Sequence, residues 1–380
     1  VMHMLTVMIV GLAMGATVSI GQSIGAGDKK RASVFVGNTV TLFMGISLVL
    51  AVLLLFFVKP IVSVMSTPAE AVSGTAAYLT ICFLGIPFIT AYNVISSIFR
   101  GLGDSKSPMY FIAVACAVNI ILDYLFIGFF HLGASGAALG TTLSQACSVL
   151  FALTGLSLSG DCFRPQKKPL GKILNIGIPV ALQDGFIQIA FIVITIIANR
   201  RGLNAAAAVG IVEKIISFLF LVPSSMLSTV SALAAQNIGA GKYDRAKQTL
   251  RYAMMIAIGF GLVVSILIQF IAAPVVGLFT ADAAVILLGA QYIRGYIWDC
   301  IFAGVHFSFS GYFCACGKSG ISFLHNLIAI LCVRIPGVYL TSKIFPHTLF
   351  PMGLATATGS LLSVIICIIA YRWLCEKSGK

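Results

Sequence analysis

Four acidic residues lie inside long apolar stretches of this sequence: Asp123, Asp184, Glu213 and Asp299. A charged side chain in apolar surroundings is costly, so such residues usually have a function. Asn119 precedes Asp123 at the i, i+4 spacing, which puts both on one face of a helix. An amide beside a carboxyl group can coordinate a cation or hold an exchangeable proton. The pair therefore indicates a cation or proton site; the alternative is a buried aspartate that only hydrogen-bonds to neighbouring helices.

The other three acids lie in the second half of the chain, on three expected helices that could meet. We expect a second polar cluster there, made of Gln183, Asp184, Gln188, Glu213 and Asp299. Lys214 follows Glu213 directly, but adjacent residues on a helix point about 100° apart, so we expect Glu213 to pair with another helix instead. Arg294 and Arg334 are the expected partners. The alternative is a salt-bridge network that only stabilises the bundle.

Membrane helices must position these side chains. Of 380 residues, 59% are hydrophobic and 9% are charged, whereas a soluble domain has roughly 25% charged residues. Apolar runs of about 20 to 27 residues suit helices that cross a bilayer better than the strands of an outer-membrane barrel. We therefore predict an all-α integral membrane protein. Its expected spans, about eleven, are 4–24, 33–58, 75–99, 109–130, 133–157, 171–199, 205–235, 247–272, 284–313, 320–343 and 348–374.

The net charge of +13 is explained by topology. Counted over alternate loops between the expected spans, seventeen Lys and Arg residues fall on one side and four on the other. This asymmetry follows the positive-inside rule and puts the C-terminus in the cytoplasm of a cell-membrane protein. The basic excess therefore implies no nucleic-acid partner.

A repeat divides the chain into two halves. The hexapeptide QSIGAG at 22–27 returns as QNIGAG at 236–241, an offset of 214 residues, and the same offset separates Tyr78 from Tyr292. Glycine there favours a helix end in the left-handed conformation. Six expected spans separate the two loops, so both halves have the same orientation and form a parallel pseudo-twofold repeat.

The repeat predicts two six-helix lobes, the first of which lacks its opening helix here. We expect an N-terminal lobe over 1–158, a cytoplasmic linker over 159–170 and a C-terminal lobe over 171–380. The start at Val1, inside an apolar run without an initiator Met, agrees with an N-terminal truncation.

Several motifs in this order carry a family resemblance: the two Gly-Ala-Gly loops, RGLGDSKSP at 100–108, NIILDYLF at 119–126 and GASGAALGTTLSQ at 133–145. Together they resemble the MATE (multidrug and toxic compound extrusion) transporters, most closely the DinF-like bacterial branch without its first helix. The resemblance implies that Asn119 and Asp123 belong to the N-lobe cation site, whose partner aspartate lies on that first helix. The C-lobe acids of the other branch correspond to Ile187 and Gly304 here, so that site is not transferred.

The resemblance implies secondary active efflux: antiport of amphipathic, cationic organic compounds against H⁺ or Na⁺ by alternating access of the two lobes. Na⁺ could bind at Asp123. We expect no cofactor or resident metal, a monomer in the lipid bilayer, and no enzymatic activity. An intramembrane protease is disfavoured although Gly101-Leu102-Gly103-Asp104 fits a G-x-G-D motif, because no second aspartate lies on a preceding helix. The alternatives are a lipid-linked oligosaccharide or polysaccharide flippase of related architecture and, less favoured, a channel.

Overall fold

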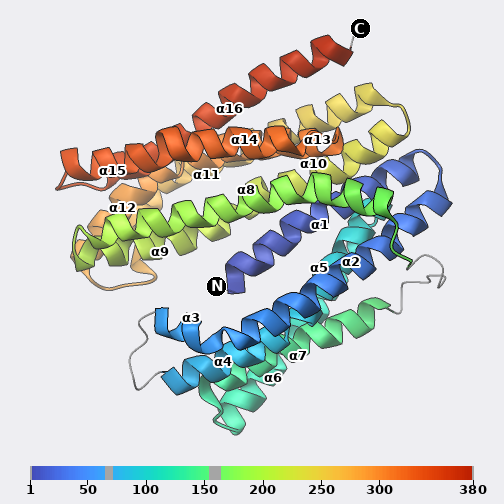
Figure 1. The fold of residues 1–380 in the computed structure, drawn as a ribbon. Coiled ribbons are helices and arrows are strands. Elements are labelled where there is room, and N and C mark those ends of the chain that lie inside the picture. The colour runs from blue at the N-terminus through green and yellow to red at the C-terminus, as the bar shows by residue number, and fades with distance from the viewer. Residues whose placement is uncertain (1, 65–71, 154–163, 379–380) are drawn as a thin grey trace. The chain divides into compact units, whose positions relative to one another are not determined.

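The protein is helical throughout the part of the chain that the computed structural model describes, residues 2–64, 72–153 and 164–378 (Figure 1). Helices satisfy their own backbone hydrogen bonds, as a bilayer interior requires. The predicted all-α membrane fold is therefore confirmed. Of the predicted linker, residues 159–163 lie outside the described ranges, and a helix already begins at Lys167.

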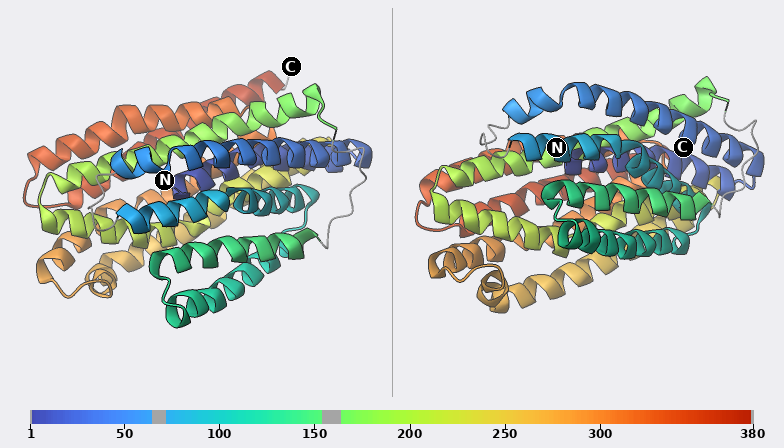
Figure 2. Two further views of the ribbon diagram at one scale, coloured as in Figure 1. Left: turned by 60° about the horizontal axis from the view of Figure 1, so that its bottom comes forward. Right: turned by 90° about the horizontal axis from the view of Figure 1, so that it is seen from below.

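The chain divides into two compact units, Val1–Gly177 and Ile178–Lys380. Within each unit, the long helices run side by side (Figure 2). The first unit contains α1 (Met2–Gly25), α2 (Lys29–Phe56), α3 (Val58–Val64), α4 (Val72–Leu84), α5 (Ile86–Leu102), α6 (Lys106–Asp123), the π-helix η2 (Tyr124–Phe129), α7 (Gly133–Leu153) and the start of α8 (Lys167–Asn199). The second contains the rest of α8, α9 (Leu203–Leu219), α10 (Leu221–Gly239), α11 (Tyr243–Gly277), α12 (Ala283–Tyr296), α13 (Asp299–Ala315), α14 (Ser319–Ala329), the π-helix η4 (Ile330–Arg334), α15 (Ile335–Ile344) and α16 (Phe350–Ser378).

Eight spans are long and apolar enough to cross a membrane, and two bent helix pairs bring the number to ten among the described residues. The bends are 43° between α4 and α5 and 41° between α9 and α10. The one predicted span outside these ten, 284–313, falls on two consecutive helices, α12 and α13, of 14 and 17 residues.

The two Gly-Ala-Gly loops have the same backbone geometry. Gly27 and Gly241 have φ values of +74° and +72°, and the next residue's N–H returns to the carbonyl five positions earlier. These hydrogen bonds, Asp28 to Ser23 and Lys242 to Asn237, measure 3.0 and 2.8 Å. This pattern is the Schellman cap, in which glycine avoids the clash that a Cβ would cause. The loops therefore end helices, as predicted.

Two further helices, those before the loops at Gly103 and Gly317, end with the same cap. These two loops are separated by the same offset as the two Gly-Ala-Gly loops. Gly103 has a φ of +92° and Gly317 one of +71°, and the following residues, Asp104 and Lys318, hydrogen-bond to Phe99 and Phe313. The repeat seen in the sequence is therefore a repeat of local backbone structure.

Small residues allow helices to approach closely in the first unit. A Cβ built on Gly15 of α1 would collide with the carbonyl oxygen of Ile173 on α8, and one on Gly177 would collide with the carbonyl oxygen of Leu12. Membrane helices have little hydrophobic drive to associate, so such backbone contact contributes much of their packing.

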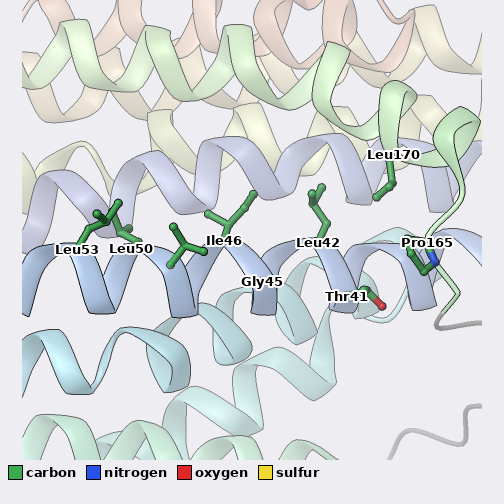
Figure 3. Close-up of a pocket in the computed structure, with 9 residues that line it drawn as sticks. Thr41, Leu42, Gly45, Ile46, Leu50, Leu53, Pro165 and Leu170 are labelled. Carbon is green, nitrogen blue, oxygen red and sulfur yellow. The ribbon is translucent and has the colours of Figure 1, made fainter.

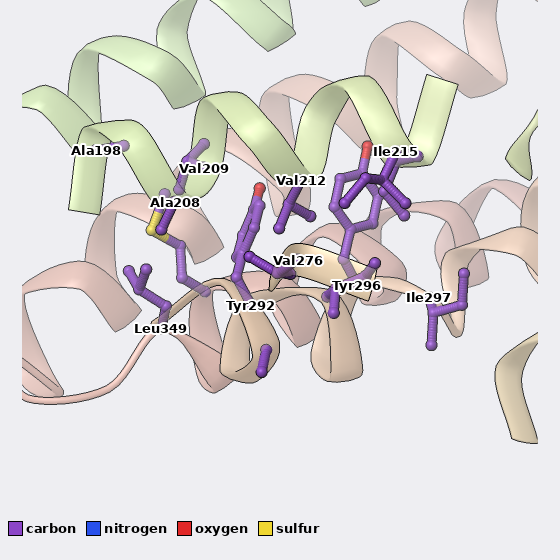
Figure 4. Packing of buried hydrophobic residues seen from close by; sticks show 14 of the residues in the cluster. Ala198, Ala208, Val209, Val212, Ile215, Val276, Tyr292, Tyr296, Ile297 and Leu349 are labelled. Atoms are coloured by element: carbon purple, nitrogen blue, oxygen red, sulfur yellow. The ribbon is translucent and has the colours of Figure 1, made fainter. Parts of the chain in front are cut away.

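The second unit has a core of aromatic and branched side chains. Tyr292 and Tyr296, one turn apart on α12, are fully buried, with ring centroids 5.6 Å apart. Figure 4 shows both hydroxyl groups directed toward α9, which contributes Val209 and Val212 to the same cluster. A tyrosine buried this deeply needs a polar partner, which points to polar groups nearby.

One face of α2 in the first unit borders an apolar groove of about 510 Å³. Leu42, Ile46, Leu50 and Leu53 follow one another along it at helical spacing, and Leu170 closes one end (Figure 3). Hydrocarbon can cover such a surface, as expected for a helix exposed to lipid.

Substitution of Gly15 tests the close approach of α1 and α8. We expect Gly15→Ala to lower the thermal unfolding temperature in detergent by several degrees, because the new methyl group must push the Ile173 carbonyl away. The matched control is Gly45→Ala on α2, where an added Cβ meets no atom within 4 Å. Equal melting temperatures for the two variants would contradict this packing.

Candidate functional site

The predicted N-lobe pair lies at the end of α6. Asp123 is the last residue of this helix, Asn119 lies one turn earlier, and the π-helix η2 follows. A π-helix within a transmembrane helix often marks a functional position. Both side chains come close to Gly140 on α7.

Gly140 shows how tightly these groups converge. A Cβ built there would collide with Asp123 Oδ1 and would lie 3.6 Å from Asn119 Nδ2. Both of these atoms are buried and have no hydrogen-bond partner. Most buried polar atoms are paired, so unpaired ones in one place call for an explanation. A flip of the amide, which exchanges its nitrogen and oxygen, would present the oxygen to the same space and give two oxygen ligands.

In the second unit, Arg334 is the central charged residue of the polar cluster. It ends η4, is 8% exposed, and its Nη2 lies 3.8 Å from Asp299 Oδ2. The same nitrogen donates a hydrogen bond of 2.8 Å to the Tyr296 hydroxyl. The guanidinium also lies over the ring of Phe191, 5.2 Å from its centroid. A buried charge needs such partners.

Glu213 joins this group from α9. The Thr195 hydroxyl lies 3.3 and 3.4 Å from its two carboxylate oxygens, and the charge of Arg334 acts on it. Asp299 accepts a further hydrogen bond from Ser360 on α16. The structure therefore brings two of the three predicted C-lobe acids to one arginine.

The third acid, Asp184, lies apart from this arginine, beside a different set of side chains. It interacts electrostatically with Cys314 on α13. Its neighbour Gln183 is fully buried and accepts a hydrogen bond of 2.6 Å from Ser322 on α14. Gln188 is half-buried further along α8. Arg294 forms no ion pair with any described residue, so of the two arginines expected as partners only Arg334 has this role.

The sequence interpretation missed two buried histidines, His306 on α13 and His325 on α14. Their ring centroids are 5.7 Å apart. His325 makes hydrogen bonds through both ring nitrogens, to Ser310 at 2.9 Å and to Ser363 at 2.6 Å. The missed signal was spacing: His306 and Ser310 follow Asp299 at intervals close to whole helical turns, which puts all three on one helical face.

Asp104 of the G-x-G-D motif has a structural role. It lies in the loop before α6, where its carboxylate accepts hydrogen bonds from the Ser107 hydroxyl and from the backbone N–H groups of Ser107 and Lys106. These bonds, the hydroxyl bond foremost, hold the pKa of Asp104 below its usual value. A capping aspartate of this kind supports helix initiation.

Long apolar helices with a few interior polar groups define the class: a multi-pass helical membrane protein. The MatE family model matches residues 1–125 and 179–340, and the chain belongs to this family of transporters. The predicted family is thus confirmed, as is the expectation that the chain is not an enzyme.

Named relatives agree with this assignment, and a solved structure has the same fold. The probable multidrug resistance protein YoeA of Bacillus subtilis is 27% identical, over 97% of this chain and 82% of its own. The multidrug export protein MepA of Staphylococcus aureus (strain N315) is 28% identical, over 94% of this chain and 80% of its own. A MOP superfamily transporter from Pyrococcus furiosus has the same fold, with a TM-score of 0.94 at 21% identity, covering 100% of this chain and 86% of that one.

Removal of the buried arginine tests the polar cluster of the second unit. We expect Arg334→Gln to destabilise the protein by about 3–5 kcal/mol, because Asp299 loses its counter-charge. The double variant Arg334→Gln/Asp299→Asn should recover part of the loss, since it removes the carboxylate that pairs with Arg334 and leaves only Glu213 uncompensated. Denaturant unfolding in detergent measures both, and a double variant as unstable as the single one would contradict the pairing.

The narrow space at Gly140 gives a second test. We expect Gly140→Ala to reduce gradient-driven transport about tenfold or more, because the methyl group would displace Asp123. Gly210→Ala on α9, where an added Cβ meets nothing within 4 Å, is the matched control. Dye efflux from proteoliposomes compares them; unchanged efflux by Gly140→Ala would show that Asp123 needs no close fit.

Proposed function

We propose that this protein is a secondary active multidrug exporter of the DinF-like branch, which expels amphipathic, cationic organic compounds in exchange for H⁺ or Na⁺. The family membership and the names of YoeA and MepA support the transport of drugs. The observation that carries the coupling mechanism is the convergence of two unpaired buried atoms, Asp123 Oδ1 and Asn119 Nδ2, at Gly140.

The chemistry of this pair suits reversible cation binding. An ionised carboxylate without a partner is costly in apolar surroundings, so Asp123 is stabilised when it takes up a proton or a sodium ion. The Asn119 amide can donate to the carboxylate or, after a flip, share a cation with it. Asp123 thus has two states of different charge, and a transporter needs such a difference to link an ion to a conformational change.

The ion gradient supplies enough free energy for useful export. A membrane potential of 100 mV gives about 2.3 kcal/mol per coupled charge, which supports a concentration ratio of roughly fifty.

The orientation in the membrane completes the proposal. The predicted cytoplasmic side carries the Gly-Ala-Gly loops with Lys29, Lys30, Arg31 and Lys242 next to them. We therefore place the C-terminus in the cytoplasm of a cell membrane and take a monomer of two lobes, 1–158 and 171–380, as the transporting form. Transport would proceed by alternating access of the two lobes.

Neutralisation of Asp123 tests the coupling role. We expect Asp123→Asn to reduce cationic dye efflux from proteoliposomes at least tenfold under an imposed pH or sodium gradient, because an amide cannot bind and release a charge. Asp282→Asn is the matched control, since Asp282 only caps α12 and asparagine caps equally well.

The same assay decides between the proposed functions. If Asp123→Asn transports as fast as the wild type, Asp123 has no part in coupling. If neither gradient drives any dye with the wild type, the antiporter proposal fails. Movement of lipid-linked oligosaccharide under those conditions would favour the flippase instead.

A further inference from the structure

His306 is a buried titratable side chain without a hydrogen-bond partner for its Nδ1 atom. It is 4% exposed, and its ring lies against that of His325, which is fully buried. An imidazole is compact, polar and able to carry a proton, and it is rarely left unpaired in an apolar interior. Packing alone would be served better by Phe or Leu at this position, so the unpaired Nδ1 atom calls for a function.

The histidine pair adjoins the arginine cluster. His306 lies on one face of α13 with Asp299, and the charge of Arg334 acts on its ring. His325 contacts Ser363 of α16, one turn after Ser360, which hydrogen-bonds to Asp299. The polar groups from Glu213 to His325 are therefore neighbours in one interior region of the second unit.

The charges of this region do not balance when both acids are ionised. Glu213 and Asp299 carry two negative charges, and Arg334 carries one positive charge. Arg294 forms no ion pair within the described ranges. Lys214, which follows Glu213 in the chain, is exposed on the surface of the unit and so does not neutralise a buried charge. A buried net charge is strongly disfavoured, so the region is most stable with one additional proton.

The remaining neighbours of α13 do not supply this charge. Helix α10 has no titratable residue, and the charged residues of α11 all precede Ala253, before the contacts of Ala257 with Gly304 and of Gly261 with Ile301. On α14 the titratable group is His325, and on α16 the titratable groups begin at Cys367, beyond Ser363. On α8, Asp184 interacts with Cys314 of α13 and adds an acid, not a positive charge. His306 therefore faces His325 and Arg334, with Glu213 and Asp299 around that arginine.

We propose that the second unit contains its own proton-binding site, in which His306 and His325 share one exchangeable proton with Glu213 and Asp299 around Arg334. This inference rests on the proposed antiport and deepens it, because it names the proton as a coupling ion and adds a site separate from Asp123. The proton resides on a carboxylate or an imidazole and passes between them without any bond to carbon being made or broken. The two serine hydroxyls that contact His325 can relay it.

Substitution of His306 tests the proposal by its pH profile. We expect His306→Asn to lower efflux driven by a pH gradient at least tenfold and to flatten its dependence on pH between about 5 and 9. Dye affinity should change less than twofold. The matched control is His347→Asn, an exposed histidine in a loop. A wild-type pH profile in His306→Asn would overturn the proposal.

A second measurement does not depend on the folding of that variant. Asparagine at His3, His131 and His347 removes the exposed histidines and leaves the buried pair; at His131, with a φ of +53°, asparagine also tolerates the left-handed backbone. With ¹⁵N-labelled histidine in this triple variant, we expect NMR to show an imidazole that changes protonation when a cationic dye binds. Two imidazoles that stay neutral between about pH 5 and 9, with and without dye, would overturn the proposal.

The failure of this inference can be told apart from failure of the antiport. If a sodium gradient alone drives efflux by the wild type, and a pH gradient does not, the antiport stands and the proton site is refuted. If neither gradient drives efflux, the antiport itself is refuted. Proton-driven efflux that depends on His306 supports both.

Discussion

The charge of Arg334 in the interior of the second unit constrains everything around it. A guanidinium cannot lose its proton there, so the fold must provide partners in place of water. Asp299, Tyr296 and the ring of Phe191 do so from three different helices. Helix α16 approaches so closely that a Cβ on Gly359 would lie 2.9 Å from Arg334 Cβ. These requirements fix how α8, α12, α13 and α16 pack in this unit.

The two units use the same backbone devices but different chemistry. Their Schellman caps coincide at one constant offset along the chain, yet the carboxylate of the first unit, Asp123, has no arginine beside it among the described residues. Both aspartates have an unpaired Oδ1 atom, but Oδ2 of Asp299 lies 3.8 Å from Arg334 Nη2. A duplicated scaffold has thus kept its helix ends while the interior polar groups diverged. The first unit has a carboxylate with no arginine beside it among the described residues, and the second has two carboxylates that share one arginine.

Features that depend on local sequence were predictable. Glycine caps, long apolar helices and the i, i+4 pairing of Asn119 with Asp123 follow from backbone preference and helical period, and the structure has all three. The division of 284–313 into α12 and α13 was not predicted, because the short break at Ile297 and Trp298 leaves the apolar pattern intact. Which side chains meet depends on the rotation of each helix about its own axis, which the sequence does not specify. The separation of Asp184 from Glu213 and Asp299, and the contact of His306 with His325, could therefore not be predicted.

The central claim is that binding of a cationic compound is linked to release of a cation from buried carboxylates. Calorimetric titration of the reconstituted protein with a dye tests this directly, in buffers of different ionisation enthalpy and at several sodium concentrations. We expect a binding heat that varies with the buffer, which corresponds to release of about one proton per dye bound, or an affinity that falls as sodium rises. A binding heat independent of the buffer, together with an affinity independent of sodium, would contradict it.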